Sequence, residues 1–253
     1  MAKTYFLSDL HLGATYMPDE REHEARVIAM LQDFGRDADS IYLLGDVLDY
    51  WYEYKTVVPR GHVRFFGELA RLADSGVKIY WFIGNHDIWL FDYLRDEIGI
   101  EVVDGNAVHT ICGHRFFLSH GDGLGDPSKA YALMRRTFRN RFAQWLFAGI
   151  HPRWTIPFAY RWSRHSRLKR GDGIARYKGD DNEIPMKFAR AYIAEHPEIE
   201  YFITGHRHIA IERPLPNGGL FVILGDCFRQ YSYGVFDGNN FSLRYYYGIP
   251  DSK

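Results

Sequence analysis

The chain is poor in cysteine and has no long apolar run, and each absence excludes a class of protein. Only Cys112 and Cys227 occur among the 253 residues. They stand far apart and outside any Cys-x-x-Cys pair, which excludes a disulfide scaffold, a zinc finger and an iron–sulfur site. The longest stretch without a charged residue is Pro214–Gly225, whereas a membrane-spanning helix needs about 20 apolar residues. The N-terminus has no charged and apolar leader, so we expect no secretion.

Length and composition indicate one globular domain. Apolar residues make up 46% of the chain and charged residues 25%, which is ordinary globular composition and argues against disorder. At about 150 residues per domain, the length predicts a single domain over residues 1–253 with room for an insertion.

The net charge is −1, but the charged residues are distributed unevenly along the chain. Residues 129–178 contain thirteen Lys and Arg against one acid, a charge of +12 that leaves −13 for the remainder. This segment is also rich in Trp, Phe and Tyr. A cationic and aromatic segment indicates an anionic partner with an apolar part, such as a lipid, a nucleic acid or a nucleotide. The alternative is a helical pair with arginines in solvent and aromatic rings in the core.

Short apolar runs alternate with helical stretches along most of the chain. The expected strands are Thr4–Leu7, Ile41–Leu44, Val77–Ile83, Arg115–Ser119 and Glu200–Thr204, and the expected helices are Asp19–Phe34, Val63–Ala73 and Ile88–Ile98. This alternation predicts an α/β fold with helices packed on a sheet of parallel strands. Three further strand-like runs at the C-terminus, Leu220–Leu224, Ser232–Phe236 and Phe241–Tyr247, are separated by turn residues. They predict a second, mostly antiparallel sheet packed on the first.

Side chains of metal-ligand type stand where the five expected strands end. They are Asp9, His11, Asp46, Asn85, His120, His206 and His208. The carboxyl ends of strands form the ligand crevice of α/β sheets, so we expect these side chains to converge. Carboxylates, imidazoles and an amide without thiolates suit Mn²⁺, with Zn²⁺ or Fe as alternatives. Seven ligands exceed the need of one ion, and if Asp46 bridges, each of two ions has four protein ligands and open positions for water and substrate.

Neighbouring carboxylates offer further candidates around these ligands. Asp122 follows the ligand His120 and is expected to support its imidazole. Asp49 follows Gly45-Asp46 on an expected loop at the mouth of the site. Asp226 stands in a Gly-Asp pair that either imitates a ligand motif or forms a turn between strands.

The order Asp-x-His, Gly-Asp, Gly-Asn-His-Asp, His-Gly-Asp and Gly-His-x-His resembles the calcineurin-like metallophosphoesterase superfamily. The resemblance implies a four-layer αββα sandwich with two metal ions between the sheets. By motif match, one ion takes Asp9, His11, Asp46 and His208, and the other takes Asp46, Asn85, His120 and His206. His86 matches the superfamily's active-site histidine, which protonates the leaving oxygen or stabilises the transition state, and Asp87 would hold its imidazole.

The stretch from Gly45 to Lys169 is similar to the UDP-2,3-diacylglucosamine hydrolases of lipid A synthesis. In that family a helical lid follows His-Gly-Asp and binds acyl chains and the glucosamine phosphate. The resemblance places an inserted lid at residues 126–172, which we call the insertion. It implies substrate contacts at Arg164, Ser166 and Arg167 in the insertion, besides Asn85, His86 and His206 at the metals. The chain departs from the better-known branch of the family, which has an arginine in place of His86.

Three functions follow from these patterns. The first is hydrolysis of the pyrophosphate bond of UDP-2,3-diacylglucosamine to 2,3-diacylglucosamine 1-phosphate and UMP, with Mn²⁺. We then expect a peripheral protein on the cytoplasmic face of the inner membrane, bound to anionic lipid and not to nucleic acid. The second is a soluble phosphoesterase acting on nucleotides or phosphoproteins, and the third is a non-catalytic scaffold. The insertion favours the first, because a compact nucleotide does not require an aromatic cationic lid. No pattern in the sequence indicates an oligomeric state.

Overall fold

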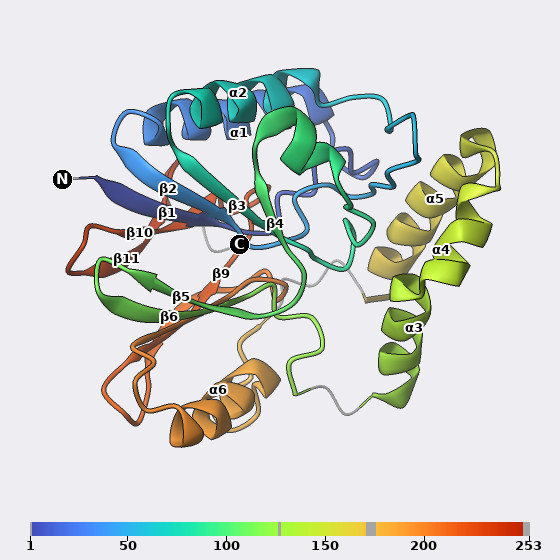
Figure 1. Ribbon diagram of the computed structural model, residues 1–253. Coiled ribbons are helices and arrows are strands. Elements are labelled where there is room, and N and C mark those ends of the chain that lie inside the picture. Colours follow the sequence, from blue (N-terminus) through green and yellow to red (C-terminus); the bar gives the residue numbers. More distant parts are fainter. Residues whose placement is uncertain (1, 126–127, 171–175, 250–253) are drawn as a thin grey trace.

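The computed structural model describes residues 2–125, 128–170 and 176–249, without the side chains of residues 164–170. Two sheets lie face to face, with helices on the outer side of each, so the order of layers is helix, sheet, sheet, helix (Figure 1). The α/β fold expected from the alternation of apolar runs is confirmed.

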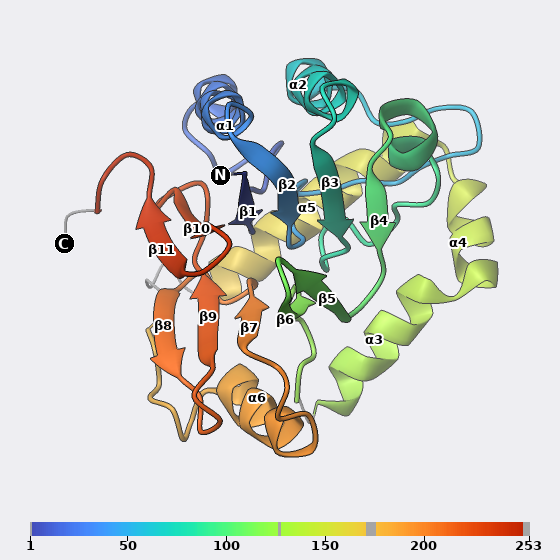
Figure 2. The ribbon, with the colours of Figure 1, turned by 60° about the vertical axis from the view of Figure 1, so that its left-hand side comes forward.

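The first sheet has the strand order β11-β10-β1-β2-β3-β4. Its strands are β1 (Lys3–Leu7), β2 (Ala38–Leu43), β3 (Lys78–Phe82), β4 (Glu101–Val103), β10 (Ser232–Phe236) and β11 (Phe241–Tyr245). Strands β1 to β4 are parallel, whereas β10 pairs antiparallel with β1 and β11. The helices α1 (Glu20–Phe34) and α2 (Val63–Asp74) cover its outer face (Figure 2).

The second sheet has the order β5-β6-β7-β9-β8. Its strands are β5 (Ala107–Ile111), β6 (His114–Ser119), β7 (Tyr201–Thr204), β8 (Ala210–Pro214) and β9 (Leu220–Leu224). The central three strands are parallel, and the two edge strands are antiparallel to their neighbours. The helix α6 (Ile184–Glu195) packs on its outer face (Figure 2).

Alternating side chains of the strands build the core layers. On β6, Phe116 packs between the two sheets with Phe6 of β1, whereas its neighbour Phe117 packs with Phe202 under α6. A third apolar cluster fills the space between the first sheet and its two helices. The sandwich is therefore closed by apolar contacts on both faces of each sheet, and this fixes the positions of the strand ends.

Two sequence-based predictions are wrong. The C-terminal strands do not form a sheet of their own, because β10 and β11 extend the first sheet and β9 pairs parallel with β7 in the second. The helix expected over Ile88–Ile98 is only a π-helical turn, η1 (Leu94–Ile98). The Glu53 carboxylate accepts hydrogen bonds from three successive backbone N–H groups just before that turn, at residues 91–93. These bonds hold the preceding segment in a non-helical conformation.

The insertion consists of three helices on one side of the sandwich, between β6 and α6 (Figure 1). They are α3 (Lys129–Arg139), α4 (Arg141–Ala148) and α5 (Pro152–Arg170). The side chains of Ser128 and Asn140 cap the first two helices. No residue of α3 or α4 is buried. In the described part of the chain, no helix combines the length and the hydropathy that crossing a bilayer requires.

Candidate metal centre

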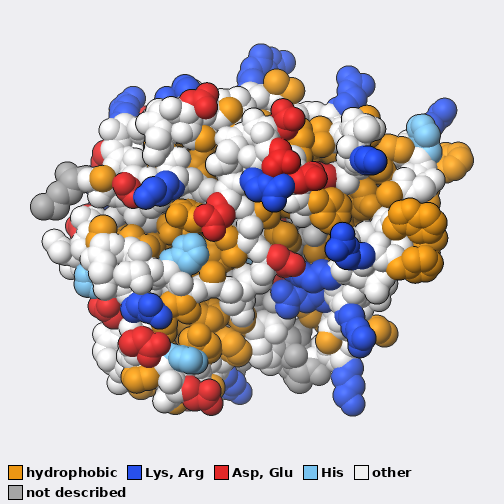
Figure 3. All heavy atoms as spheres, in the orientation of Figure 1, with side chains coloured by type: hydrophobic (Ala, Val, Ile, Leu, Met, Phe, Trp, Pro, Cys, Tyr) orange, Lys and Arg blue, Asp and Glu red, His pale blue; other side chains and the backbone are white. Residues whose placement is uncertain are grey.

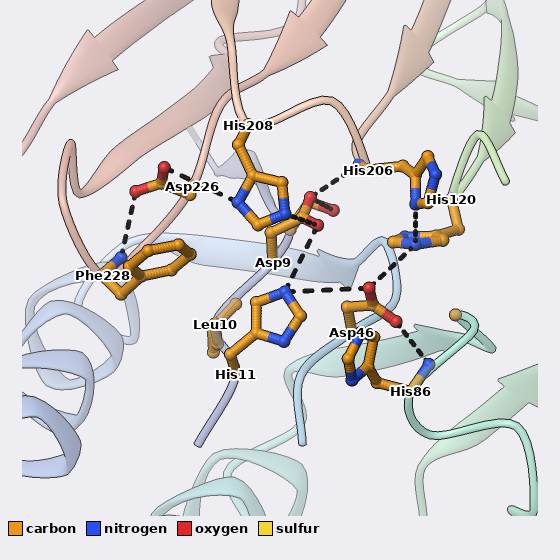
Figure 4. A network of polar contacts seen from close by, with 12 residues as sticks. Asp9, Leu10, His11, Asp46, His86, His120, His206, His208, Asp226 and Phe228 are labelled. Carbon is orange, nitrogen blue, oxygen red and sulfur yellow. Dashed lines mark hydrogen bonds and ion pairs between the residues drawn. The ribbon is translucent and has the colours of Figure 1, made fainter. Parts of the chain in front are cut away.

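The seven expected metal ligands lie where strands of both sheets end. Six of them, with His86, are drawn in Figure 4, where their side chains turn toward a common centre. Asp9 and His11 follow β1, Asp46 follows β2, and Asn85 follows β3 of the first sheet. The other three histidines come from the second sheet, where His120 follows β6 and both His206 and His208 follow β7. The structure thus brings together side chains that are up to two hundred positions apart in the sequence.

The backbone at five of these ligands is left-handed, a conformation that residues other than glycine rarely adopt. The positions are Asp9, His11, Asp46, His206 and His208, with φ between 48° and 65°. Hydrogen bonds to the neighbouring strand end hold two of them, because the N–H groups of Asp9 and His11 donate to the carbonyls of Gly45 and Asp46. Left-handed residues of this kind concentrate at functional sites, where the surrounding structure enforces them.

Asp9 lies between two imidazoles. Its Oδ1 is 3.4 Å from Nε2 of His208 and 3.7 Å from Nε2 of His11. Its Oδ2 accepts hydrogen bonds from the Ser8 hydroxyl and from the backbone N–H of His206, both at 2.7 Å. One oxygen therefore anchors the carboxylate, and the other is presented to the two imidazoles.

Asp46 occupies the centre of the site. Its Oδ1 accepts the backbone N–H of His86 at 2.8 Å. Its Oδ2 lies 3.3 Å from Nε2 of His120 and 3.7 Å from Nε2 of His11, which belong to different ligand groups. Nδ1 of His206 is 3.2 Å from Nε2 of His120. Asp46 is thus placed where a carboxylate can bridge two ions.

The donor atoms fit divalent cations. Ligand atoms of Asp9, His11 and His208 lie within 4.8 Å of one another, as do those of Asp46, His120 and His206. The Oδ1 atoms of Asp9 and Asn85 are buried and accept no hydrogen bond, which is costly for an oxygen without a cation.

The pKa values of three ligands shift toward the forms that bind metal, whereas that of His120 shifts the other way: burial lowers its pKa, but the facing Asp46 carboxylate holds it well above the usual value. Burial raises the pKa of Asp9 and Asp46, but the facing imidazoles outweigh burial and hold the pKa of both below the usual range. Burial and the neighbouring His120 lower the pKa of His206 to about 3. The two carboxylates are therefore ionised and the His206 imidazole is neutral, which are the forms that bind metal.

The expectation that Asp87 holds the His86 imidazole is wrong. The Asp87 carboxylate accepts hydrogen bonds from the backbone N–H groups of Val47 and Gly84 and from the Trp81 indole. Burial, followed by the nearby Asp46 charge, raises the pKa of Asp87 to about 6. Asp87 therefore ties the ends of β2 and β3 together, and both of its carboxylate oxygens are engaged with groups other than the His86 ring.

Asp49 takes the role that was expected of Asp87. Nδ1 of His86 is 3.0 Å from the Asp49 carbonyl oxygen and 3.4 Å from its Oδ1. The same Oδ1 lies 3.2 Å from Nδ1 of His11. Burial raises the pKa of Asp49, but the hydrogen bonds to His11 and His86 lower it well below the usual range. The signal in the sequence was a carboxylate three positions after Asp46 in an otherwise apolar and aromatic run.

The remaining carboxylates near the site support other groups. Nδ1 of His120 contacts the Leu44 carbonyl at 2.8 Å, so the prediction that Asp122 supports this imidazole is wrong. Asp122 instead accepts a hydrogen bond from Tyr131 of α3. Asp226 accepts the backbone N–H groups of its own turn and also lies 3.8 Å from Nδ1 of His208. It therefore forms the turn that was one interpretation of its Gly-Asp pair, and its carboxylate also faces the His208 imidazole.

The expected substrate contacts fall into two sets. Asn85, His86 and His206 lie at the centre described above. Arg164, Ser166 and Arg167 are in the C-terminal half of α5, and their side chains lie outside the described part of the structure.

A cavity of about 620 Å³ lies between the insertion and the edge of the first sheet. Ile83, Ile88, Leu90 and Ile100 line it on the side of the sandwich, and the insertion contributes cationic residues that include Arg139. None of the described residues that line it is one of the seven expected metal ligands, but Ile83 and Ile88 stand on either side of the Gly-Asn-His-Asp turn in the sequence. Its volume lies in the range of sites that enclose a ligand of moderate size.

The outer face of the insertion is apolar and cationic. Among the described residues, eight of the fourteen large apolar side chains that are exposed belong to it: Leu133, Phe142, Trp145, Leu146, Ile150, Trp154, Phe158 and Trp162. Trp145 and Trp154 are each 68% exposed. Figure 3 shows these side chains as a broad apolar area over α4 and α5, with Lys and Arg around it. An exposed area of this kind marks a binding surface.

The chain is similar to known proteins in sequence and in fold. The sequence model of the calcineurin-like phosphoesterases matches residues 2–210. A UDP-2,3-diacylglucosamine hydrolase of Porphyromonas gingivalis is 41% identical, over 96% of this chain and 97% of its own. A protein of the same name from Neisseria gonorrhoeae is 28% identical over 92% of each chain. Among solved structures, a dimetal phosphatase of Danio rerio is 13% identical, with a TM-score of 0.48 over 97% of this chain and 99% of its own.

Proposed function

Because the chain belongs to the calcineurin-like phosphoesterases, which are hydrolases, we propose that it cleaves the pyrophosphate bond of UDP-2,3-diacylglucosamine. The products are 2,3-diacylglucosamine 1-phosphate and UMP. The observation that carries this substrate is the insertion, which adds an aromatic, cationic surface and, together with the edge of the first sheet, lines a cavity. The relatives named for this substrate support the same choice.

The two halves of this substrate match two parts of the site. The diphosphate is anionic and suits the cluster of metal ligands, whereas the acyl chains need an apolar space. The cavity between the insertion and the first sheet supplies apolar walls at Ile88, Leu90 and Ile100. On its rim Arg139 is paired with Asp104, so we assign Arg141 to the phosphate at the junction of the two halves.

We assign the metal centre to two divalent cations, Mn²⁺ in preference to Zn²⁺ or Fe. One is held by Asp9, His11, Asp46 and His208, and the other by Asp46, Asn85, His120 and His206. Such ions supply a nucleophile derived from water and positive charge for the reacting phosphate. The protein contributes ligands fixed in the left-handed backbone, so little reorganisation accompanies the reaction.

His86 stabilises the transition state in this proposal. Because its Nδ1 faces Asp49, its Nε2 is the nitrogen directed to a phosphate oxygen. UMP is a good leaving group, so a strong acid is not required. Asn85 and His206 contact the same phosphate, and Arg164, Ser166 and Arg167 of α5 bind the glucosamine phosphate.

The insertion also brings the protein to its substrate. Near an anionic bilayer each cation contributes about 1 kcal/mol of attraction, and exposed aromatic side chains insert at the interface. The +12 segment would face the lipid, and the −13 remainder would face away. We therefore place the protein at the cytoplasmic face of the inner membrane, bound peripherally and without a nucleic acid partner.

A substrate comparison tests the proposal. The purified chain with Mn²⁺ is assayed on UDP-2,3-diacylglucosamine, on bis-nucleoside polyphosphates and on a p-nitrophenyl diester, with phosphorus NMR of the products. We expect kcat/KM to be at least about 100-fold higher on the acylated substrate, with UMP as a product. Equal or better turnover of the dinucleotides would overturn the substrate and favour the soluble phosphoesterase.

A further inference from the structure

Ser163 of α5 contacts a residue that supports two imidazoles of the site. Its hydroxyl donates a hydrogen bond to Oδ2 of Asp49 at 2.8 Å. Both side chains are buried, at 5% exposure for Ser163 and 3% for Asp49. A hydrogen bond to a buried carboxylate is strong, because the acceptor is charged and water is excluded.

The other oxygen of the same carboxylate faces the site. Oδ1 of Asp49 lies 3.2 Å from Nδ1 of His11 and 3.4 Å from Nδ1 of His86. The two oxygens are rigidly joined, so a rotation of the carboxylate that breaks the bond to Ser163 also moves Oδ1 away from both rings. The orientation of a metal ligand and of the active-site histidine is thus coupled to a hydroxyl of the insertion.

Residues 49–54, which begin with Asp49, lie between the sandwich and the insertion, and we call them the seam. Along the seam, the even-numbered side chains face the insertion. Tyr50 packs on Tyr160, and the Tyr52 hydroxyl donates to the Gln144 carbonyl. The Tyr54 hydroxyl lies 2.7 Å from the Thr155 hydroxyl. Odd-numbered Trp51 and Glu53 are buried in the sandwich and bond to each other. This alternation is that of an extended chain. Asp49 begins the seam, where its odd-numbered side chain faces the metal ligands.

We propose that Ser163 is a positioning residue for the metal centre. By fixing Asp49, it sets the ring orientation of His11, which presents Nε2 to the cation, and of His86. Groups that orient metal ligands in this way typically change metal affinity by 10–100-fold when they are removed. The insertion is then part of the catalytic assembly as well as a cover for the substrate. The inference rests on the two-metal centre of the proposed function and not on the acylated substrate.

Removal of single hydroxyls tests this role. Ser163→Ala removes the bond to Asp49, and Ser163→Thr keeps a hydroxyl at the same position. Thr155→Val is the matched control, because it removes another buried hydroxyl from the described part of α5, which is 3% exposed and contacts the Tyr54 hydroxyl. Calorimetric titration of the metal-free proteins with Mn²⁺ and turnover of a p-nitrophenyl diester are measured, with Tm for each variant.

We expect Ser163→Ala to weaken binding of one Mn²⁺ by about 10-fold or more and to lower kcat on the diester. Ser163→Thr should restore both, and Thr155→Val should change only Tm. Unchanged Mn²⁺ affinity in Ser163→Ala overturns the inference. Equal losses of affinity in Ser163→Ala and Thr155→Val also overturn it, because they would reflect general loosening of α5. The titration uses no substrate, so a failure of the proposed substrate is seen separately.

Discussion

Gly84 follows β3 and packs against Asp46 at the end of β2. Its replacement by alanine tests whether this close contact holds Asp46 in place. A Cβ at this position would lie 2.3 Å from the backbone nitrogen of Asp46 and 2.3 Å from its Oδ1. Ordinary contact begins at 3.4 Å, so the two strand ends must separate by about 1 Å. Gly84→Ala therefore displaces Asp46 from the imidazoles on either side of it.

The expected effect is larger on activity than on stability. Overpacking of this kind costs about 1–3 kcal/mol of the free energy of unfolding. For a chain of this length, that lowers Tm by about 2–12 °C. A displacement of about 1 Å at reacting groups costs about 100-fold in rate. We expect Gly84→Ala to fold, to bind Mn²⁺ more weakly and to lose at least about 99% of its activity.

Gly67 provides the matched control for this substitution. It lies in the interior of α2, and a Cβ there meets nothing within 4 Å. Gly67→Ala should raise stability by about 0.5–1 kcal/mol, because alanine loses less conformational freedom in a helix. Denaturant unfolding, Mn²⁺ titration and initial rates are compared for the two variants. If Gly84→Ala keeps half of the wild-type activity with an unchanged Tm, the close approach of the two strand ends is not what holds Asp46.

Three further predictions concern the proposed activity. Asp46→Ala should lower activity by at least about 1,000-fold with the fold intact, because it removes the bridging ligand; retention of a tenth of the activity in rate assays would contradict two bridged ions. His86→Arg should keep more activity than His86→Ala, because Arg supplies a fixed cation to the phosphate; equal losses would indicate proton transfer instead. Wild-type protein should co-sediment with anionic vesicles at about 50 mM salt and be released at about 500 mM. A Trp154→Ala/Trp162→Ala variant should sediment poorly while hydrolysing the diester normally, and loss of both properties would assign a structural role to the outer face.

The convergence of these seven side chains could be predicted because it depends on short-range patterns. An apolar run that ends in a residue of metal-ligand type and a glycine indicates a strand end, and parallel strands of one sheet present their carboxyl ends together. The roles of neighbouring residues could not be predicted in this way. Asp87 follows His86 directly, yet its carboxylate bonds to the backbone of Val47 and Gly84, while Asp49 reaches the His86 ring from another strand end.

Strand partners were the least predictable part of the fold. The pattern of β10 indicates a strand with one buried face, but it carries no information on which strand lies beside it. Thr4 pairs with Phe236, and this pairing of the two ends of the chain depends on packing across the whole sandwich. The helix expected over Ile88–Ile98 failed for a similar reason, because the Glu53 carboxylate that bonds to its backbone comes from another segment.

The left-handed backbone at five ligand positions affects how the sequence would evolve if the activity were no longer under selection. Each of these residues carries a conformational cost of about 1 kcal/mol that glycine would not. Five such costs are comparable to the lower end of the whole stability of a domain, about 5 kcal/mol. A descendant released from catalysis would gain stability from glycine at the partly exposed His206 and His208. At Asp9 and Asp46 the gain would be offset, because their carboxylates accept backbone N–H groups that glycine would leave unbonded. Histidine at positions 206 and 208 therefore marks a chain whose stability is held below what its fold allows.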